Sequence, residues 1–217
     1  MAIHIKLDAM TLDELLRDWV EALSQFGIGG IIVLGPDPFG GEEDRLVLAL
    51  SQPEMIDAAK ALAESREFGS QWRAADAPLV LSSCLGGHEA KWRTKLQALG
   101  FQSFVRVAVP LPLGRMFECY LFSGRDLGES EASLVAWSAQ SVWPTIKRAL
   151  VKEHCRLSKK EIECLTLTVQ TMSPSEIGQL LGCAERTVHF HLSNAMKKLQ
   201  TDSKLAAMQR AMWSGLF

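Results

Sequence analysis

Several features that mark other classes of protein are missing from this sequence. No apolar run reaches the roughly 18 to 20 residues that a membrane-spanning helix needs. The amino-terminal residues do not join a basic stretch to a long apolar one, as a secretory signal does. No internal repeat and no low-complexity segment occurs. Since 47% of the residues are hydrophobic, we expect a folded, soluble, cytoplasmic protein with no membrane contact.

Cysteine is scarce and has no pattern. The chain of 217 residues contains five cysteines, an odd number, with no Cys-x-x-Cys spacing. They are Cys84, Cys119, Cys155, Cys164 and Cys183. Most of them have apolar neighbours in the sequence. We therefore expect reduced thiols in the core, no metal site and no cofactor.

Neither sign of charge dominates the whole chain, but its two parts have opposite net charge. Residues 1–154 carry 15 Lys and Arg against 20 Asp and Glu, whereas residues 155–217 carry 8 against 5. A basic module suits a polyanion, because neutralising phosphates releases condensed counterions. A chance fluctuation of a few charges is the alternative explanation.

The first 150 residues mix helix and strand patterns. Helices are expected from Thr11 to near Gly27, from Pro53 to about Arg66, over Glu89–Leu99 and from about Glu129 to Lys152. Strands are expected over 28–34, 46–50, 79–82, 104–109 and 116–122, with a turn over 35–41. The last two strands form an antiparallel hairpin, which favours an antiparallel sheet between helical layers over a parallel sheet. The long helix from Glu129 is expected to cover the sheet and to dimerise.

Explicit start signals place helices in the last third of the chain. Ser158 with Glu161, and Ser173 with Glu176, are capping boxes, and Pro174 stands at a first helical position. Gly182 ends the second of these helices, and a short turn leads into a third from Glu185 to about Leu199. Two helices joined by a tight turn are typical of a DNA-binding unit.

The third of these helices has a core face and a polar face. Its apolar positions, spaced by three and four residues, are Val188, Leu192, Ala195, Met196 and Leu199. The opposite face can reach bases and phosphates in a major groove. The candidate DNA-binding residues are Glu185, Arg186, Thr187, His189, Phe190, Ser193, Lys197 and Lys198. An ordinary amphipathic helix with a solvated basic face is the alternative for this helix taken alone.

This stretch closely resembles the DNA-binding domain of LuxR-type regulators. The matching residues are Leu157, Glu161, Leu165, Glu176-Ile177, Leu180-Leu181-Gly182, Thr187-Val188-His189-Phe190-His191, Lys198-Leu199, Lys204, Ala207 and Gly215-Leu216. The chain departs from the family at Thr171, where glycine is usual, at Gly178, where alanine is usual, and at Ala184, where a serine cap is usual. His189 stands where the family often has Asn or a basic residue, so the operator is not predictable. His191 is expected to pack within the domain.

By the order of its elements, the amino-terminal part resembles the family's autoinducer-binding domain, an α-β-α sandwich that holds an acyl-homoserine lactone. The resemblance implies a pocket of aromatic and acidic side chains. The candidate ligand-binding residues are Trp72, Asp76, Trp92, Phe101 and Phe104, and core packing is the alternative for each aromatic residue. The family's Trp-x-x-x-Tyr pair and downstream Asp-Pro do not align, and the single tyrosine, Tyr120, stands in a different place.

Taken together, the sequence predicts an α+β protein with two domains. Residues 1–152 form a sensory and dimerisation sandwich with an antiparallel sheet, and residues 153–217 form an all-α four-helix domain of helix-turn-helix type. The predicted function is that of a dimeric transcriptional regulator, with a quorum-sensing role as one candidate and with double-stranded DNA and a small autoinducer-like molecule as partners. A modulator that pairs with another LuxR-type protein is the alternative. An enzyme using Cys84 beside Gly86-Gly87-His88-Glu89 lacks an orienting group and an oxyanion motif.

Overall fold

The structure is a computed structural model that describes residues 11–37, 45–50, 53–65, 80–86, 90–110, 116–154 and 156–214. Contacts divide the chain into two compact units, and the division falls between Ala149 and Leu150. Each unit is described by itself below. Among the described helices, none combines the length and the apolar composition that crossing a membrane requires.

The first unit is built on a five-stranded sheet. The strands are β1 (Ile28–Pro36), β2 (Arg45–Leu50), β3 (Val80–Cys84), β4 (Ser103–Pro110) and β5 (Met116–Ser123), in the order β2-β1-β5-β4-β3. Every neighbouring pair is antiparallel. The expected hairpin is confirmed, since Phe104 pairs with Phe122 and Val107 with Cys119.

Strand β1 is longer than the sequence predicts. Gly35 and Pro36 were expected to begin a turn, but both pair with β2. A Cβ atom at Gly35 would lie 2.5 Å from the ring of Phe117, so this glycine is required by the close approach of an aromatic side chain on β5. The rest of the expected turn, residues 38–41, lies outside the described residues.

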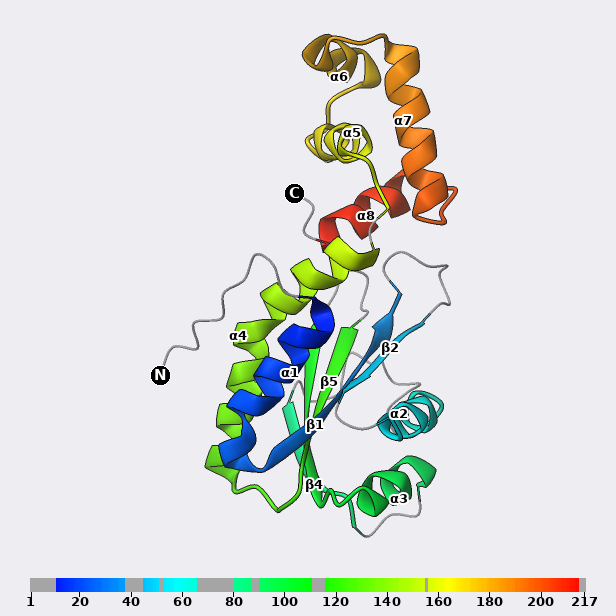
Figure 1. Cartoon of the computed structure of the whole chain (residues 1–217). Coiled ribbons are helices and arrows are strands. Elements are labelled where there is room, and N and C mark those ends of the chain that lie inside the picture. Colours follow the sequence, from blue (N-terminus) through cyan, green and yellow to red (C-terminus); the bar gives the residue numbers. More distant parts are fainter. Residues whose placement is uncertain are drawn as a thin grey trace. The chain divides into compact units, whose positions relative to one another are not determined.

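Helices cover both faces of the sheet (Figure 1). On one face lie α1 (Leu12–Ala22) and α4 (Glu129–His154), and on the other lie α2 (Met55–Ala63) and α3 (Lys91–Ala98). A short 3-10 helix (Ser24–Phe26) and Gly27, whose φ is +74°, connect α1 to β1. The unit is therefore an α-β-α sandwich with an antiparallel sheet, as the sequence predicts.

The residues of α4 divide by burial. Val142 and Ile146 are buried against the unit, as expected for a helix that covers a sheet. Leu134 and Trp137, by contrast, are 57% and 73% exposed. Covering the sheet thus accounts for only some of the apolar residues of this helix.

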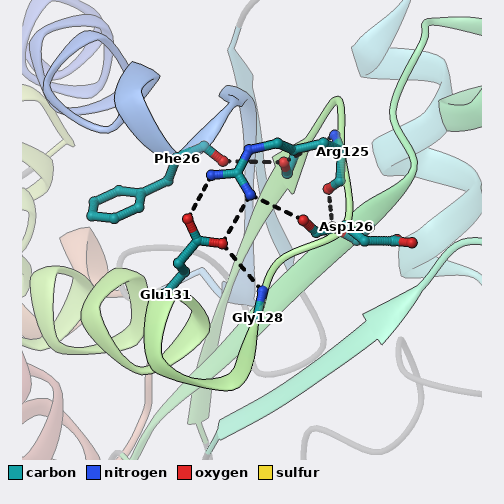
Figure 2. A network of polar contacts seen from close by, with 7 residues as sticks. Phe26, Arg125, Asp126, Gly128 and Glu131 are labelled. Carbon is teal, nitrogen blue, oxygen red and sulfur yellow. Dashed lines mark hydrogen bonds and ion pairs between the residues drawn. The ribbon is translucent and has the colours of Figure 1, made fainter.

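A polar network holds the first turn of α4 (Figure 2). The two terminal nitrogens of Arg125 donate to the two carboxylate oxygens of Glu131 at 2.8 and 2.6 Å. The carboxylate of Glu131 also accepts from the amide of Gly128 at 3.2 Å. The Ser103 hydroxyl donates to the carbonyl of Arg125 at 2.7 Å, which connects the network to β4. The hydrogen bonds from Arg125, the largest cause, and from Gly128 lower the pKa of Glu131 to about 2.

The cysteines do not all lie in the core, contrary to expectation. Cys119 and Cys164 are buried, but Cys84 is exposed and Cys183 is intermediate. Cys84 is the last residue of β3, an edge strand on which alternate side chains face solvent. Its thiol lies 3.3 Å from a carboxylate oxygen of Asp126, which raises its pKa and so opposes formation of a nucleophilic thiolate. His88 and Glu89, the other groups of the enzyme hypothesis, lie outside the described residues.

The second unit is all-α in its described residues. Its helices are α5 (Lys159–Val169), α6 (Pro174–Leu181), α7 (Glu185–Lys198) and α8 (Lys204–Ser214). Each contributes to one small core. The buried members of this core are Cys164, Leu165, Ile177, Val188, Leu192, Ala195, Leu199, Ala207 and Ala211. The predicted fold class, α+β with a four-helix carboxy-terminal part, is confirmed.

Candidate nucleic-acid interface

Hydrogen bonds that the sequence predicts fix the beginning and end of α6. The Ser173 hydroxyl accepts from the amide of Glu176 at 3.3 Å, and the Glu176 carboxylate accepts from the amide of Ser173 at 2.7 Å. Gly182 ends the helix in the left-handed conformation with φ +67°. The amide of Cys183 then donates to the carbonyl of Gly178 at 2.9 Å. The chain therefore reverses within three residues, between Leu181 and the start of α7.

The closeness of this turn explains one departure from the LuxR pattern. A Cβ atom at Gly178 would lie 2.7 Å from the carbonyl oxygen of Cys183 and 3.3 Å from the amide nitrogen of Glu185. Both contacts are with backbone, which cannot move aside as a flexible side chain can. Glycine replaces the usual alanine here because α6 and the turn approach too closely for a methyl group.

Helix α7 buries one side and exposes the other. Val188, Leu192, Ala195 and Leu199 are buried, as predicted, whereas Met196 is only partly buried. The candidate DNA-binding residues lie on the other side: all are exposed except Ser193, which is intermediate. Phe190 is 60% exposed, which is unusual for an aromatic residue on a polar face.

Two glutamates lie against basic residues of the exposed face. His189 Nε2 lies 3.5 Å from a carboxylate oxygen of Glu185, one turn earlier. Lys198 Nζ donates to Glu161 Oε2 at 2.8 Å, and Glu161 is buried. Burial opposes ionisation of Glu161, but the hydrogen bonds from Lys198 and Ser158 outweigh it and lower the pKa of this carboxyl. Lys198 thus also holds α7 to α5, so Lys197 is better placed than Lys198 to contact a phosphate.

The two neighbouring aromatic residues of α7 differ in burial. His191 is half-buried, and its ring lies edge-on to Phe190 with the ring centroids 5.8 Å apart. Since Phe190 is itself exposed, the expectation that His191 packs within the domain stays a prediction. Phe190, which is turned to solvent, remains a candidate for contact with a groove.

The other two departures from the LuxR pattern carry local costs. Thr171 follows α5 with φ +65°, the left-handed region where its β-branched side chain is strained. Ala184 is the N-cap of α7 and provides no side-chain hydrogen bond. The free energy of unfolding is therefore lower with Thr171 and Ala184 than with the glycine and serine of the pattern.

In the first unit, the structure brings three of the candidate ligand-binding residues together. Trp92 on α3, Phe101 between α3 and β4, and Phe104 on β4 belong to one buried cluster between the sheet and the α2–α3 layer. The rings of Trp92 and Phe104 meet edge to face with centroids 5.6 Å apart. Trp72 and Asp76 lie outside the described residues. Tyr120 belongs to the same cluster, so its place in the sequence does not remove it from the candidate pocket.

A buried polar group beside this cluster is absent from the sequence-based prediction. The Arg106 guanidinium donates to Glu118 Oε1 at 2.7 Å, and the Tyr120 hydroxyl donates to Glu118 Oε2 at 3.1 Å. All three side chains are buried, and burial, followed by the charge of Glu118, raises the pKa of Tyr120. The sequence feature that could have predicted this group is one Arg and one Glu within two strands that are otherwise apolar. Glu118 also borders a hollow of about 10 Å³, enough for roughly one water molecule.

The second unit therefore has the geometry of a helix-turn-helix DNA-binding domain, with α6 and α7 as its two helices. Residues 156–211 match the family of bacterial regulatory proteins of luxR type. LuxR, a transcriptional activator protein of Aliivibrio fischeri, is 41% identical over 64 residues, which are 30% of this chain and 26% of LuxR. Residues 156–211 thus belong to the luxR family.

Two further similarities extend beyond this domain. RpaR of Rhodopseudomonas palustris, a quorum sensing-dependent transcriptional regulator, is 30% identical over 132 residues, 58% of this chain and 54% of RpaR. The structure of SdiA in complex with octanoyl-rac-glycerol superposes with a TM-score of 0.54 and 18% identity, over 95% of this chain and 89% of SdiA. The matches to LuxR and RpaR span about a quarter and about half of those proteins. The likeness to SdiA shows that the fold is shared.

Proposed function

We propose that this protein is a sequence-specific DNA-binding transcriptional regulator that works as a dimer. The observation that carries the proposal is the exposed face of α7, on which Arg186, His189 and Phe190 stand clear of the core of a helix-turn-helix unit. Arginine and histidine donate to base edges, and a phenyl ring suits the methyl group of thymine. The names of the relatives, which are transcriptional regulators, support the same function.

The small number of base pairs that one recognition helix can contact supports a dimer. A single recognition helix reads only a few base pairs, so tight and specific binding needs a second helix at a half-site about one helical turn away. A twofold assembly of two chains supplies that second helix. A homodimer is the simplest such assembly.

We further propose that the first unit binds a small autoinducer-like molecule between the sheet and the α2–α3 layer. Trp92, Phe101 and Phe104 supply an apolar surface there, and Arg106, Glu118 and Tyr120 supply buried polar groups beside it. Trp72 and Asp76, the other two candidates from the sequence, lie outside the described residues. Such a mixture of aromatic walls with a few polar groups is typical of small-molecule sites.

A second candidate function is a ligand-independent regulator that acts by pairing with another LuxR-type protein. The close ring contacts among Trp92, Phe104 and Phe122 favour it. Among the described residues, these rings fill this part of the space between the sheet and the helices, where a ligand would otherwise bind. Residues 1–154 also carry more acidic than basic residues, so this part of the chain suits a protein partner better than DNA.

The DNA proposal is tested by three alanine variants on a DNA sequence selected from a random pool. Arg186→Ala and His189→Ala are expected to weaken specific binding by about 1 to 3 kcal/mol if those side chains read bases. Lys197→Ala is expected to weaken binding to all sequences and to reduce the slope of log affinity against log salt by about one. Lys60→Ala, an exposed lysine on α2, is the matched control for the loss of one charge. Full retention of affinity by the Arg186 and His189 variants would remove both from the reading face.

The ligand proposal is tested by thermal unfolding and DNA titration with a panel of acyl-homoserine lactones and with octanoyl glycerol. A ligand that binds the folded state raises the melting temperature in a concentration-dependent manner. Phe104→Ala is expected to abolish that rise, while Ile56→Ala on the outer side of α2 leaves it unchanged. DNA binding that no compound alters would favour the ligand-independent candidate.

A further inference from the structure

Two cysteines of the second unit meet at the edge of its core. Cys164 is a buried residue of α5, and Cys183, which is half-buried, packs against the same core from the turn between α6 and α7. They are 19 residues apart in the chain, so they are brought together by the packing of α5 on the helix-turn-helix. Among the described residues of this unit, they are the only two cysteines, and both are free thiols.

A lysine lies beside both thiols. Lys160 precedes Cys164 by four residues on α5, so the two side chains share one face of the helix. A hydrogen bond of 2.7 Å to Glu163 is the largest cause of the raised pKa of Lys160, and the thiols of Cys183 and Cys164 add to it. The side chain of Lys160 is 57% exposed. The two thiols therefore lie where the core opens to solvent, beside a positive charge.

The two thiols differ in access and in acidity. Burial, followed by the nearby Cys183, raises the pKa of Cys164, which keeps this thiol protonated. Lys160 acts in the opposite direction, because a cation favours a thiolate. Cys183 is partly open to solvent, so it is the thiol that a dissolved oxidant meets first. Cys164 is then the second thiol, which captures the oxidised sulfur of the first.

We propose that Cys164 and Cys183 form a disulfide when the protein meets a peroxide, and that this bond lowers the affinity of the protein for its DNA site. The thiol of Cys183 takes one oxygen atom from hydrogen peroxide, which gives a sulfenic acid and one water. The sulfur of Cys164 then attacks the sulfur of this sulfenic acid. The S–S bond forms, the S–O bond breaks, and the departing hydroxide takes the thiol proton of Cys164 to give a second water. The peroxide is reduced and the two thiols are oxidised.

The effect on DNA rests on the proposed function and on the place of Cys183 in the turn. Cys183 directly precedes Ala184, the N-cap of α7. Its carbonyl oxygen would lie 2.7 Å from a Cβ atom at Gly178, so the turn is packed closely against α6. The sulfur atoms of two free thiols must approach to about 2 Å to form the bond. This approach draws the turn towards α5 and displaces the start of α7, where Arg186 stands.

Peptide mass tests the disulfide directly. No Lys or Arg lies between Glu161 and Glu185, so trypsin releases both cysteines in one peptide, residues 161–186. After treatment of the full chain with hydrogen peroxide and alkylation of the remaining thiols, this peptide is expected to carry no alkyl group. Its mass should be about 2 Da below that of the reduced peptide, because two hydrogen atoms are lost. A peptide alkylated at both cysteines, or one that only gains oxygen, would overturn the proposal.

Titration of the same samples on a selected DNA site measures the effect of the bond. Oxidation is expected to weaken specific binding at least about tenfold, as the displacement of one base-reading residue would, and a thiol reductant should reverse the loss. Cys183→Ser and, separately, Cys164→Ala should bind DNA and no longer respond to peroxide. Cys84→Ser, at an exposed position in the first unit, is the matched control and should respond as the wild type does. Circular dichroism checks that each variant folds.

The outcomes separate this proposal from the proposed function. Unchanged affinity of the oxidised wild type, or a response that survives in Cys183→Ser, would overturn the effect of the bond on DNA binding. Absence of specific binding by the reduced wild type would overturn the proposed function together with that effect. The disulfide itself would then still stand or fall by the peptide mass alone.

Discussion

Thr171 is a residue whose side chain works against the backbone that it occupies. Its amide donates to the carbonyl of Thr168 at 3.0 Å, and the next amide, of Met172, donates to Leu167 at 3.2 Å. These bonds end α5 and require a left-handed residue at position 171, where φ is +65°. The sequence revealed the departure from the family's glycine, but the structure shows that the conformation is kept although the glycine is lost.

Replacing Thr171 with glycine is expected to stabilise the second unit by about 0.5 to 1 kcal/mol. The relief of left-handed strain is about 1 to 2 kcal/mol, and the greater freedom of glycine in the unfolded chain offsets part of it. Urea unfolding of the full chain, followed by circular dichroism, measures the change. Gly100→Ala is the converse control, because Gly100 has φ +90° and is expected to lose stability with a side chain. A Thr171→Gly variant that is less stable than the wild type would contradict the strain argument.

Ala184 is a second position where one side chain can change helix stability. Its φ of −70° and ψ of 148° suit an N-cap, but alanine offers no acceptor to the first amides of α7. Ala184→Ser is expected to add about 1 kcal/mol to the free energy of unfolding, and Ser173→Ala, at the capped α6, to remove about as much. The same urea titrations measure both. Equal stability of the Ala184 variant and the wild type would mean that solvent already satisfies those amides.

At the level of secondary structure, the starts of the capped helices were predictable, whereas the exposed face of α4 was not. The capping boxes at Thr11, Ser158 and Ser173 signal their helices by local chemistry, and all three form both reciprocal hydrogen bonds. The exposed face of α4 could not be predicted in this way. Period alone places Leu134 and Trp137 among the apolar positions and does not say which apolar residues meet the sheet.

The buried group of Arg106, Glu118 and Tyr120 was missed for a similar reason. Its members lie on two strands whose apolar runs predict burial on both faces, and a charged residue in such a run is ordinarily assigned to the surface. Only the register, which sets Arg106 opposite Tyr120, shows that the side chains share one face. Such pairing depends on tertiary structure and has no local sequence signature.

The link between Arg125 and Glu131 at the start of α4 gives this element a pH dependence. The pKa of Glu131 is about 2 in the folded protein, below its ordinary value of 4.5, so the folded state favours the ionised form. A lowered folded-state pKa contributes stability that is present above about pH 4.5 and is lost as the pH falls towards 2.

Glu131→Gln is therefore expected to lower the free energy of unfolding at neutral pH. Between pH 5 and pH 3, that free energy should fall less steeply for the variant than for the wild type. Glu129→Gln, at an exposed position two residues earlier, is the control and should follow the wild-type profile. Unfolding free energies at a series of pH values measure the difference. Parallel pH profiles for the wild type and the Glu131 variant would show that the bridge contributes nothing to acid sensitivity.

At the scale of the whole molecule, the charge asymmetry and the helix pattern point to the same part of the chain for the proposed contact with DNA. The basic residues 155–217 coincide with a helix-turn-helix unit whose reading helix exposes Arg186, His189 and Lys197. The exposure of most of this face was predictable, because polar and core positions follow helical spacing on one short helix. The involvement of Lys198 with Glu161, 37 residues earlier, was not, because that contact depends on how α5 packs on α7.

The central claim, specific DNA binding by a dimer, is tested most directly by titrating the purified full chain on genomic fragments, including its own promoter. The titration is repeated at two salt concentrations and against an excess of random DNA. At least one fragment is expected to be bound at least about 1,000-fold more tightly than random DNA, with two chains per site. Equal affinity for all fragments, or one chain per site, would contradict it.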